Sequence, residues 1–116
     1  MIIEKPWGTV ATYALNQPSS VRVVTVRPGA ETSVHYHRMR DETWVVLDPG
    51  LQVEVGDALT EPVPGDEFMI PAEQTHRIRC VGSAPGRILE IAYGYTSEDD
   101  SLRLEDPYGR PLEPDW

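Results

Sequence analysis

The sequence is poor in the residues that mark several classes of protein. Its 116 residues include one cysteine, one phenylalanine and three histidines. The lone cysteine, Cys80, excludes an intramolecular disulfide and a zinc site built from cysteines. Uncharged apolar runs such as 44–47 are far shorter than the roughly 20 residues that span a bilayer. We therefore expect no membrane-spanning segment.

The chain shows no basic N-terminal region followed by an apolar stretch, so no secretory signal is visible and we expect a cytoplasmic protein. Positive charge is scarce, because 10 Lys and Arg oppose 19 Asp and Glu, a formal net charge of −9. Nucleic-acid phosphates would be repelled, so we expect no nucleic-acid partner. Nearly all the bases are arginines, whose guanidinium fork can still hold an anionic small molecule in a local pocket.

Helical periodicity is also missing, so we expect at most a minor helical component. The 11 prolines and 9 glycines are spread along the chain and separate short segments rich in β-branched and aromatic residues. This pattern predicts an all-β fold of seven to nine strands, closed into a barrel or sandwich. The clearest strand segments are 10–13, 21–26, 44–47, 51–55, 68–70, 77–81 and 87–93.

The length leaves room for one domain, which we assign to residues 1–116. Residues 97–116 differ from the rest, because they hold seven acids, two arginines and three prolines. We expect this acidic C-terminal tail to pack on the barrel as irregular structure.

The three histidines are arranged in a way that indicates a metal site. His35 and His37 are two residues apart, Glu42 follows closely, and His76 begins a later strand segment. Because side chains at i and i+2 of a strand share a face, the first two imidazoles can converge on one point. Imidazole and carboxylate donors suit a divalent metal ion such as Zn²⁺, Mn²⁺, Fe²⁺, Ni²⁺ or Co²⁺. The alternative is that the histidines are ordinary buried core residues.

The spacing of these residues is specific enough to suggest a family. Residues 29–42 read G-x5-H-x-H-x4-E, and residues 65–76 read G-x5-P-x-E-x2-H. They resemble the two cupin motifs, except that Glu73 replaces the last glycine of the second motif and puts a side chain into a tight turn. The resemblance implies a single small jelly-roll barrel, a double-stranded β-helix, in which the three histidines and Glu42 bind the metal.

Four further segments resemble one particular family of cupins. Residues 5–8, 37–46, 64–78 and 98–110 look like type II mannose-6-phosphate isomerase, so nearly the whole chain is covered. In that family the cupin is often the C-terminal domain of a bifunctional enzyme that begins with a GDP-mannose pyrophosphorylase domain. We expect a stand-alone sugar-phosphate cupin here, since no Gly-rich nucleotide loop precedes it. His35 departs from the family, in which glutamine is common at this place.

The resemblance implies a reaction and a cofactor. Mannose 6-phosphate and fructose 6-phosphate would interconvert through an enediol, with a metal polarising the sugar and a base moving a proton between C1 and C2. Glu90 is the candidate base, because it shares a strand face with Ile88 and Ala92, and Glu67 is the second candidate. The alternative is that Glu90 only pairs with an arginine.

The sugar phosphate is the expected partner, and three bases of the family-like segments are the candidates to bind it. Arg40 stands between two candidate ligands, so we expect its guanidinium near the mouth of the site, while Arg110 and Lys5 are further candidates. The alternative for Arg40 is a structural salt bridge to Asp41 or to an acid of the tail. The apolar start of the chain, residues 1–3, is consistent with a homodimer that exchanges N-terminal strands.

Two other functions stay open at this point, because a fold and a metal site do not define an activity. One is a non-catalytic, metal-containing cupin that binds a sugar or sugar phosphate. The other is an iron-dependent dioxygenase, since three histidines and a glutamate around iron also activate oxygen.

Overall fold

The computed structural model describes residues 1–95, 101–105 and 107–108, and within these it contains strands and no helix. No helix of the described chain could therefore cross a membrane. The all-β prediction is confirmed, although eleven strands form where seven to nine were expected. The strands are β1 (Ile2–Lys5), β2 (Gly8–Ala11), β3 (Ser19–Val26), β4 (Val34–His37), β5 (Glu42–Val46), β6 (Leu51–Val55), β7 (Ala58–Thr60), β8 (Glu67–Ile70), β9 (His76–Cys80), β10 (Gly86–Tyr93) and β11 (Ser101–Glu105).

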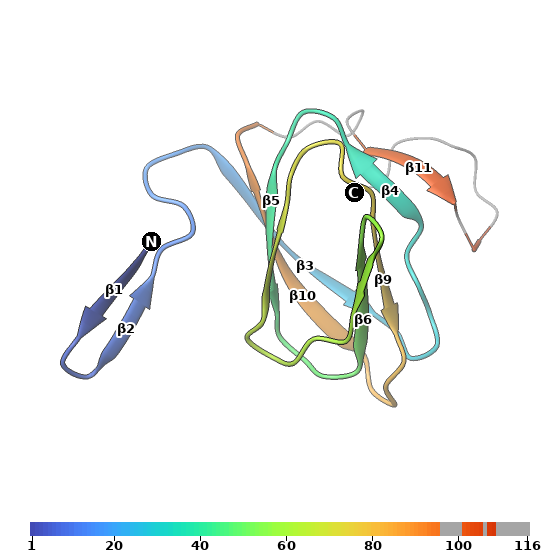
Figure 1. Ribbon diagram of the computed structural model, residues 1–116, viewed down its shortest axis with the longest axis horizontal. Helices are drawn as coiled ribbons and strands as arrows, with labels where there is room; N and C mark the ends of the chain where they lie inside the picture. The colour runs from blue at the N-terminus through green and yellow to red at the C-terminus, as the bar shows by residue number, and fades with distance from the viewer. Residues whose placement is uncertain (96–100, 106, 109–116) are drawn as a thin grey trace.

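Two antiparallel sheets face each other and enclose the core (Figure 1). One has the strand order β3-β10-β5-β8 and the other β11-β4-β9-β6-β7. Alternate residues of the inner strands are buried, as in β9, because successive side chains of a strand point to opposite faces. The core contains Val26, Trp44, Val46, Leu51, Val53, Ile70, Ile78, Cys80 and Ile88.

The registers divide the barrel interior into an apolar and a polar end. On the first sheet, Ile88 lies opposite Val46, whereas Glu90 two residues later lies opposite Trp44 and Arg22. On the second sheet, the pairing of β4 with β9 sets His35 opposite His76. Charged and imidazole side chains thus gather at one end of a small barrel.

The first two strands form a hairpin that projects from the barrel and, among the described residues, pairs with no other strand (Figure 1). All of its strand residues are exposed. Trp7, at its turn, is 74% exposed. A hairpin with no sheet or helix beneath it has no face on which to bury a large side chain.

The described part of the C-terminal tail is a strand. Residues 101–105 form β11, which pairs with β4 at the edge of the second sheet, with Ser101 opposite His37. The prediction of irregular structure is wrong for these residues, because the edge of β4 offers backbone donors and acceptors that any sequence can pair with. The rest of the tail, apart from 107–108, lies outside the described residues.

The homodimer stays a prediction, and the hairpin supplies its test. Ile3 and Val10 are cross-strand partners on one face of the hairpin and are 41% and 39% exposed. An isolated hairpin is marginally stable by itself, so we expect a second chain to cover this face. Light scattering should report a dimer for the wild type and a monomer for the double substitution of Ile3 and Val10 by Asp. Ile2→Asp, on the opposite face, is the matched control, and a monomeric wild type would refute the expectation.

Candidate functional site

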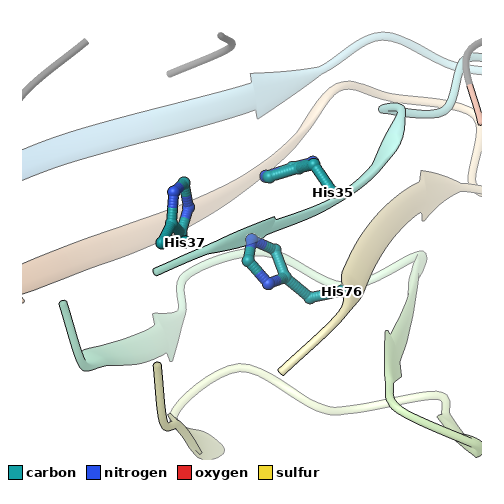
Figure 2. Close-up of side chains that lie close together, drawn as sticks. All are labelled: His35, His37 and His76. Atoms are coloured by element: carbon teal, nitrogen blue, oxygen red, sulfur yellow. The ribbon is translucent and has the colours of Figure 1, made fainter. Parts of the chain in front are cut away.

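The paired strands β4 and β9 bring all three histidines of the chain together. His35 and His37 project from β4, and His76 stands at the start of β9, so that their rings surround a common space (Figure 2). One donor atom from each ring lies within 4.8 Å of the others, and the residues are 0%, 2% and 1% exposed. The ring centroids of His35 and His76 are 4.1 Å apart.

Hydrogen bonds to the backbone fix the tautomers of two rings. Nδ1 of His35 lies 3.0 Å from the carbonyl oxygen of Ser33, and Nδ1 of His76 lies 3.0 Å from that of Gln74. A carbonyl only accepts, so each Nδ1 carries the proton and each Nε2 presents its lone pair. Both Nε2 atoms are buried. This is how protein imidazoles are oriented before they bind a metal.

Burial also keeps the imidazoles of His37 and His76 neutral. It lowers the pKa of His37 to about 2, with the positive charge of Arg40 as the second cause. It lowers the pKa of His76 to about 3, with the nearby His35 ring as the next contribution. Neutral imidazoles that converge in a buried space are the donor set that zinc and related divalent ions bind. The three histidines therefore fit a divalent metal ion.

The turn before His76 has the backbone conformation that the glycine of the cupin motif would favour, although Glu73 stands at that position. Glu73 has a φ of 71°, in the left-handed region that favours glycine. Its backbone N–H donates to the carbonyl oxygen of His37 at 2.5 Å. This bond ties the turn to β4, so His76 still reaches the cluster despite the side chain at position 73.

Glu42 lies beside the histidines with both oxygens engaged by other groups. Its Oε2 accepts from Nε of Arg40 at 2.8 Å, and its Oε1 accepts from Nε1 of Trp44 at 3.1 Å. Oε2 is 3.5 Å from Nε2 of His37. Glu42 is thus adjacent to the cluster without being one of the converging donors. Its role as a fourth metal ligand stays a prediction.

Arg40 is enclosed by protein groups and does not lie at the mouth of the site. It is 3% exposed, and its Nη2 donates to Nε2 of His37 at 3.0 Å. The same Nη2 is 3.8 Å from Oε1 of Glu90, which is 1% exposed. Of the two roles weighed for Arg40, the geometry favours the structural ion pair, formed with Glu42.

Glu90 faces the barrel interior, as its alternation with Ile88 and Ala92 requires. It also forms a carboxyl pair with Glu42. Burial raises the pKa of Glu42, and the charge of Glu90 and a hydrogen bond with it raise the value further, against the opposing effect of Arg40. A buried carboxyl with a raised pKa is more readily protonated than an exposed one, so the polar end of the barrel brings a protonatable carboxyl, that of Glu42, next to the histidines.

The remaining predicted site residues are not placed beside the cluster. Lys5 ends β1 on the exposed hairpin, away from the barrel (Figure 1). Glu67, the second candidate base, is exposed and accepts a hydrogen bond from the hydroxyl of Tyr13. Arg110 lies outside the described residues.

The sequence matches the family described as mannose-6-phosphate isomerase C-terminal over residues 1–106. The chain belongs to this family. The family assignment agrees with the architecture, since solved double-stranded β-helix proteins share the fold. An uncharacterised protein with a double-stranded β-helix domain from Klebsiella pneumoniae aligns with a TM-score of 0.67 at 22% identity, covering 79% of this chain and 78% of that one. The predicted cupin jelly roll is confirmed.

Relatives in the family are longer proteins. The xanthan biosynthesis protein XanB of Xanthomonas campestris is 35% identical over 109 residues, which cover 93% of this chain and 23% of XanB. The alginate biosynthesis protein AlgA of Pseudomonas aeruginosa is 35% identical over 113 residues, which cover 97% of this chain and 24% of AlgA. The chain thus spans about a quarter of the length of these relatives. A structure titled putative sugar phosphate isomerase, from Acidithiobacillus ferrooxidans, has a TM-score of 0.61 at 22% identity and covers 72% of this chain and 53% of that one.

Loss of the buried guanidinium should destabilise the barrel strongly. Arg40→Met leaves two buried carboxyls without their cation, and breaking a buried ion pair from one side costs about 3–5 kcal/mol. We expect that loss in the free energy of unfolding, measured by urea denaturation. Arg87→Met is the control, because Arg87 pairs with Asp48 at the surface and its loss should have a much smaller effect. Equal losses in the two variants would contradict the prediction.

Stability of the metal-free protein should depend on pH through the histidines. The folded pKa values of His37 and His76 lie below the ordinary value near 6.5, so their contribution is complete above pH 6.5 and is lost as the pH falls. Each adds a slope of about 1.4 kcal/mol per pH unit. The raised pKa of Glu42 acts in the opposite sense, but two histidines outweigh one carboxyl.

Urea denaturation between pH 7 and 4 should therefore show a decreasing free energy of unfolding for the metal-free wild type. His76→Gln removes one of the two titrating histidines, so the free energy of unfolding should change less with pH in this variant. A wild-type stability that is constant over this range would show that the buried imidazoles do not control it.

Proposed function

We propose that this chain is a metal-dependent sugar-phosphate isomerase that interconverts mannose 6-phosphate and fructose 6-phosphate. The observation that carries the proposal is the buried cluster of His35, His37 and His76, next to a carboxyl pair, in a member of the mannose-6-phosphate isomerase C-terminal family. We infer that the reaction supplies polysaccharide biosynthesis, because the relatives XanB and AlgA are named for xanthan and alginate biosynthesis.

The reaction moves a proton between two neighbouring carbons of an open-chain sugar, so it needs a base and a means of polarising the carbonyl. The three histidines would hold a divalent metal, which supplies Lewis acidity toward the sugar oxygens when bound. Glu90 is the proposed base, since its buried carboxyl faces the same interior as the histidines. It would accept the proton from one carbon and return it to the other.

Neighbouring residues would prepare Glu90 for this role. Arg40, 3.8 Å from Oε1, keeps a positive charge beside the carboxyl, and Glu42 shares a hydrogen bond with it. Together they hold Glu90 in one orientation inside the barrel. A general base must both accept and return a proton, and Arg40 and Glu42 would keep the Glu90 carboxyl in place through both steps.

The decisive experiment measures fructose 6-phosphate formed from mannose 6-phosphate by protein loaded separately with Zn²⁺, Mn²⁺, Co²⁺ and Fe²⁺. We expect turnover with at least one metal and none after chelation. His76→Ala should lose both stoichiometric metal binding and turnover. Glu90→Gln should keep the metal and lower kcat by about 10²–10⁴-fold, the usual contribution of a general base. Glu67→Gln, which removes the exposed carboxyl that was the second candidate, should behave like the wild type.

The possible negative results separate the other functions. Stoichiometric metal binding without turnover would refute the isomerase and favour a non-catalytic cupin that binds a sugar or its phosphate. Oxygen consumption by the iron-loaded protein would instead favour a dioxygenase. An unchanged kcat in Glu90→Gln, with turnover intact, would remove Glu90 from the mechanism.

A further inference from the structure

A second arginine faces the barrel interior. Arg22 lies in the middle of β3, where alternate residues from Ser20 to Val24 are partly buried. Its register partner on β10 is Glu90, which is itself opposite Trp44 on β5. Directly opposite residues of antiparallel strands project to the same face of the sheet. Since Glu90 and Trp44 are buried in the interior, Arg22 points to that side as well.

Arg22 lies on the same side of the cluster as His37. Its positive charge is one of the influences that lower the pKa of His37, after burial, Arg40 and the other two histidines. In Figure 2 the His37 ring extends from its own strand toward the side on which the ribbons of β3 and β10 run. The guanidinium of Arg22 is therefore across the barrel interior from the histidines, on the opposite sheet.

The two interior arginines differ in their partners. Arg40 is held by Glu42 and His37. Arg22 takes part in no ion pair or hydrogen bond within the described part of the chain, although Glu90 is its register partner. Acids are abundant in a chain of net charge −9, so an inward arginine that has no acidic partner among the described residues is unusual. A partly buried guanidinium gains most from an anion that it can bind with two parallel hydrogen bonds.

We propose that Arg22 binds the phosphate group of the sugar-phosphate substrate, an inference that rests on the proposed function. The phosphate on C6 and the reacting carbons C1 and C2 are at opposite ends of the open-chain sugar. A substrate with its carbonyl end at the histidines of β4 and β9 must therefore place its phosphate elsewhere in the interior. Arg22, on the facing sheet, meets this requirement, whereas Arg40 is engaged and Lys5 is on the hairpin.

The test compares Arg22→Gln with Arg27→Gln, which removes an equal charge from an exposed position just after the same strand. Calorimetry on the metal-loaded protein measures binding of mannose 6-phosphate, inorganic phosphate and unphosphorylated mannose. We expect Arg22→Gln to weaken binding of the two phosphates about 10- to 100-fold, the loss of a charged hydrogen-bonding partner, and to leave mannose unchanged. Arg22→Lys should recover part of the affinity, and Arg27→Gln should stay within about twofold of the wild type.

Kinetics and stability complete the test. For mannose 6-phosphate, Arg22→Gln should raise KM far more than it lowers kcat, while metal stoichiometry and the unfolding midpoint stay at wild-type values. Phosphate affinity equal to the wild type would overturn the inference. So would a large fall in stability at unchanged affinity, because Arg22 would then be a structural residue.

The results also separate this inference from the proposed function. Turnover that is unaffected in Arg22→Gln would support the isomerase and refute the role of Arg22. Phosphate binding that depends on Arg22, in a wild type that turns over no mannose 6-phosphate with any metal, would support the role of Arg22 and refute the isomerase. A wild type that binds neither phosphate probe would refute both.

Discussion

The polar end of the barrel depends on one buried guanidinium. Arg40 donates to Glu42 and His37 and lies near Glu90, so a single cation serves two carboxyls and an imidazole. Carboxylates taken out of water without a cation would cost several kcal/mol each, and Arg40 offsets that cost. The same contact has a consequence for the metal. Because the guanidinium engages Nε2 of His37, a metal ion that uses this nitrogen must displace Arg40, which couples metal binding to the ion-pair network.

The histidine cluster could be predicted because it follows from local rules. Alternation along β4 sets His35 and His37 on one face, and the barrel topology then pairs β4 with β9 and adds His76. The direction of Arg40 could not be predicted in this way. It lies in the loop between β4 and β5, where no strand periodicity applies, so its side chain is oriented by the carboxyls that need neutralising. Arg22 did carry a signal, because it is a charged residue in phase with Val24 and Val26 on one strand face.

The same distinction explains which strands were found from the sequence. Strands of the barrel interior, such as β9 and β10, carry apolar residues in alternation and were predicted nearly in full. Three strands were missed, β1, β7 and β11, and of these β1 and β7 are exposed along their whole length. Their order comes from backbone pairing with a neighbour, and such pairing leaves little trace in side-chain chemistry. The turn at Glu73, by contrast, could be predicted, because the cupin motif has a glycine there. Glu73 indeed has a left-handed backbone conformation.

The division of groups between the two facing sheets bears on the chemistry. The histidines come from β4 and β9, whereas Glu42, Glu90 and Arg22 come from strands of the other sheet. A ligand lying between the sheets would therefore meet metal-binding nitrogens on one side and carboxyls with a guanidinium on the other. Oxygen activation at iron does not require the carboxyls and the guanidinium of the other sheet, since dioxygen is small and uncharged. An anionic sugar that exchanges a proton needs each of the groups on this sheet: a base, a neighbour that holds the base in place, and a cation for the phosphate. This asymmetry is why we favour the isomerase over the dioxygenase.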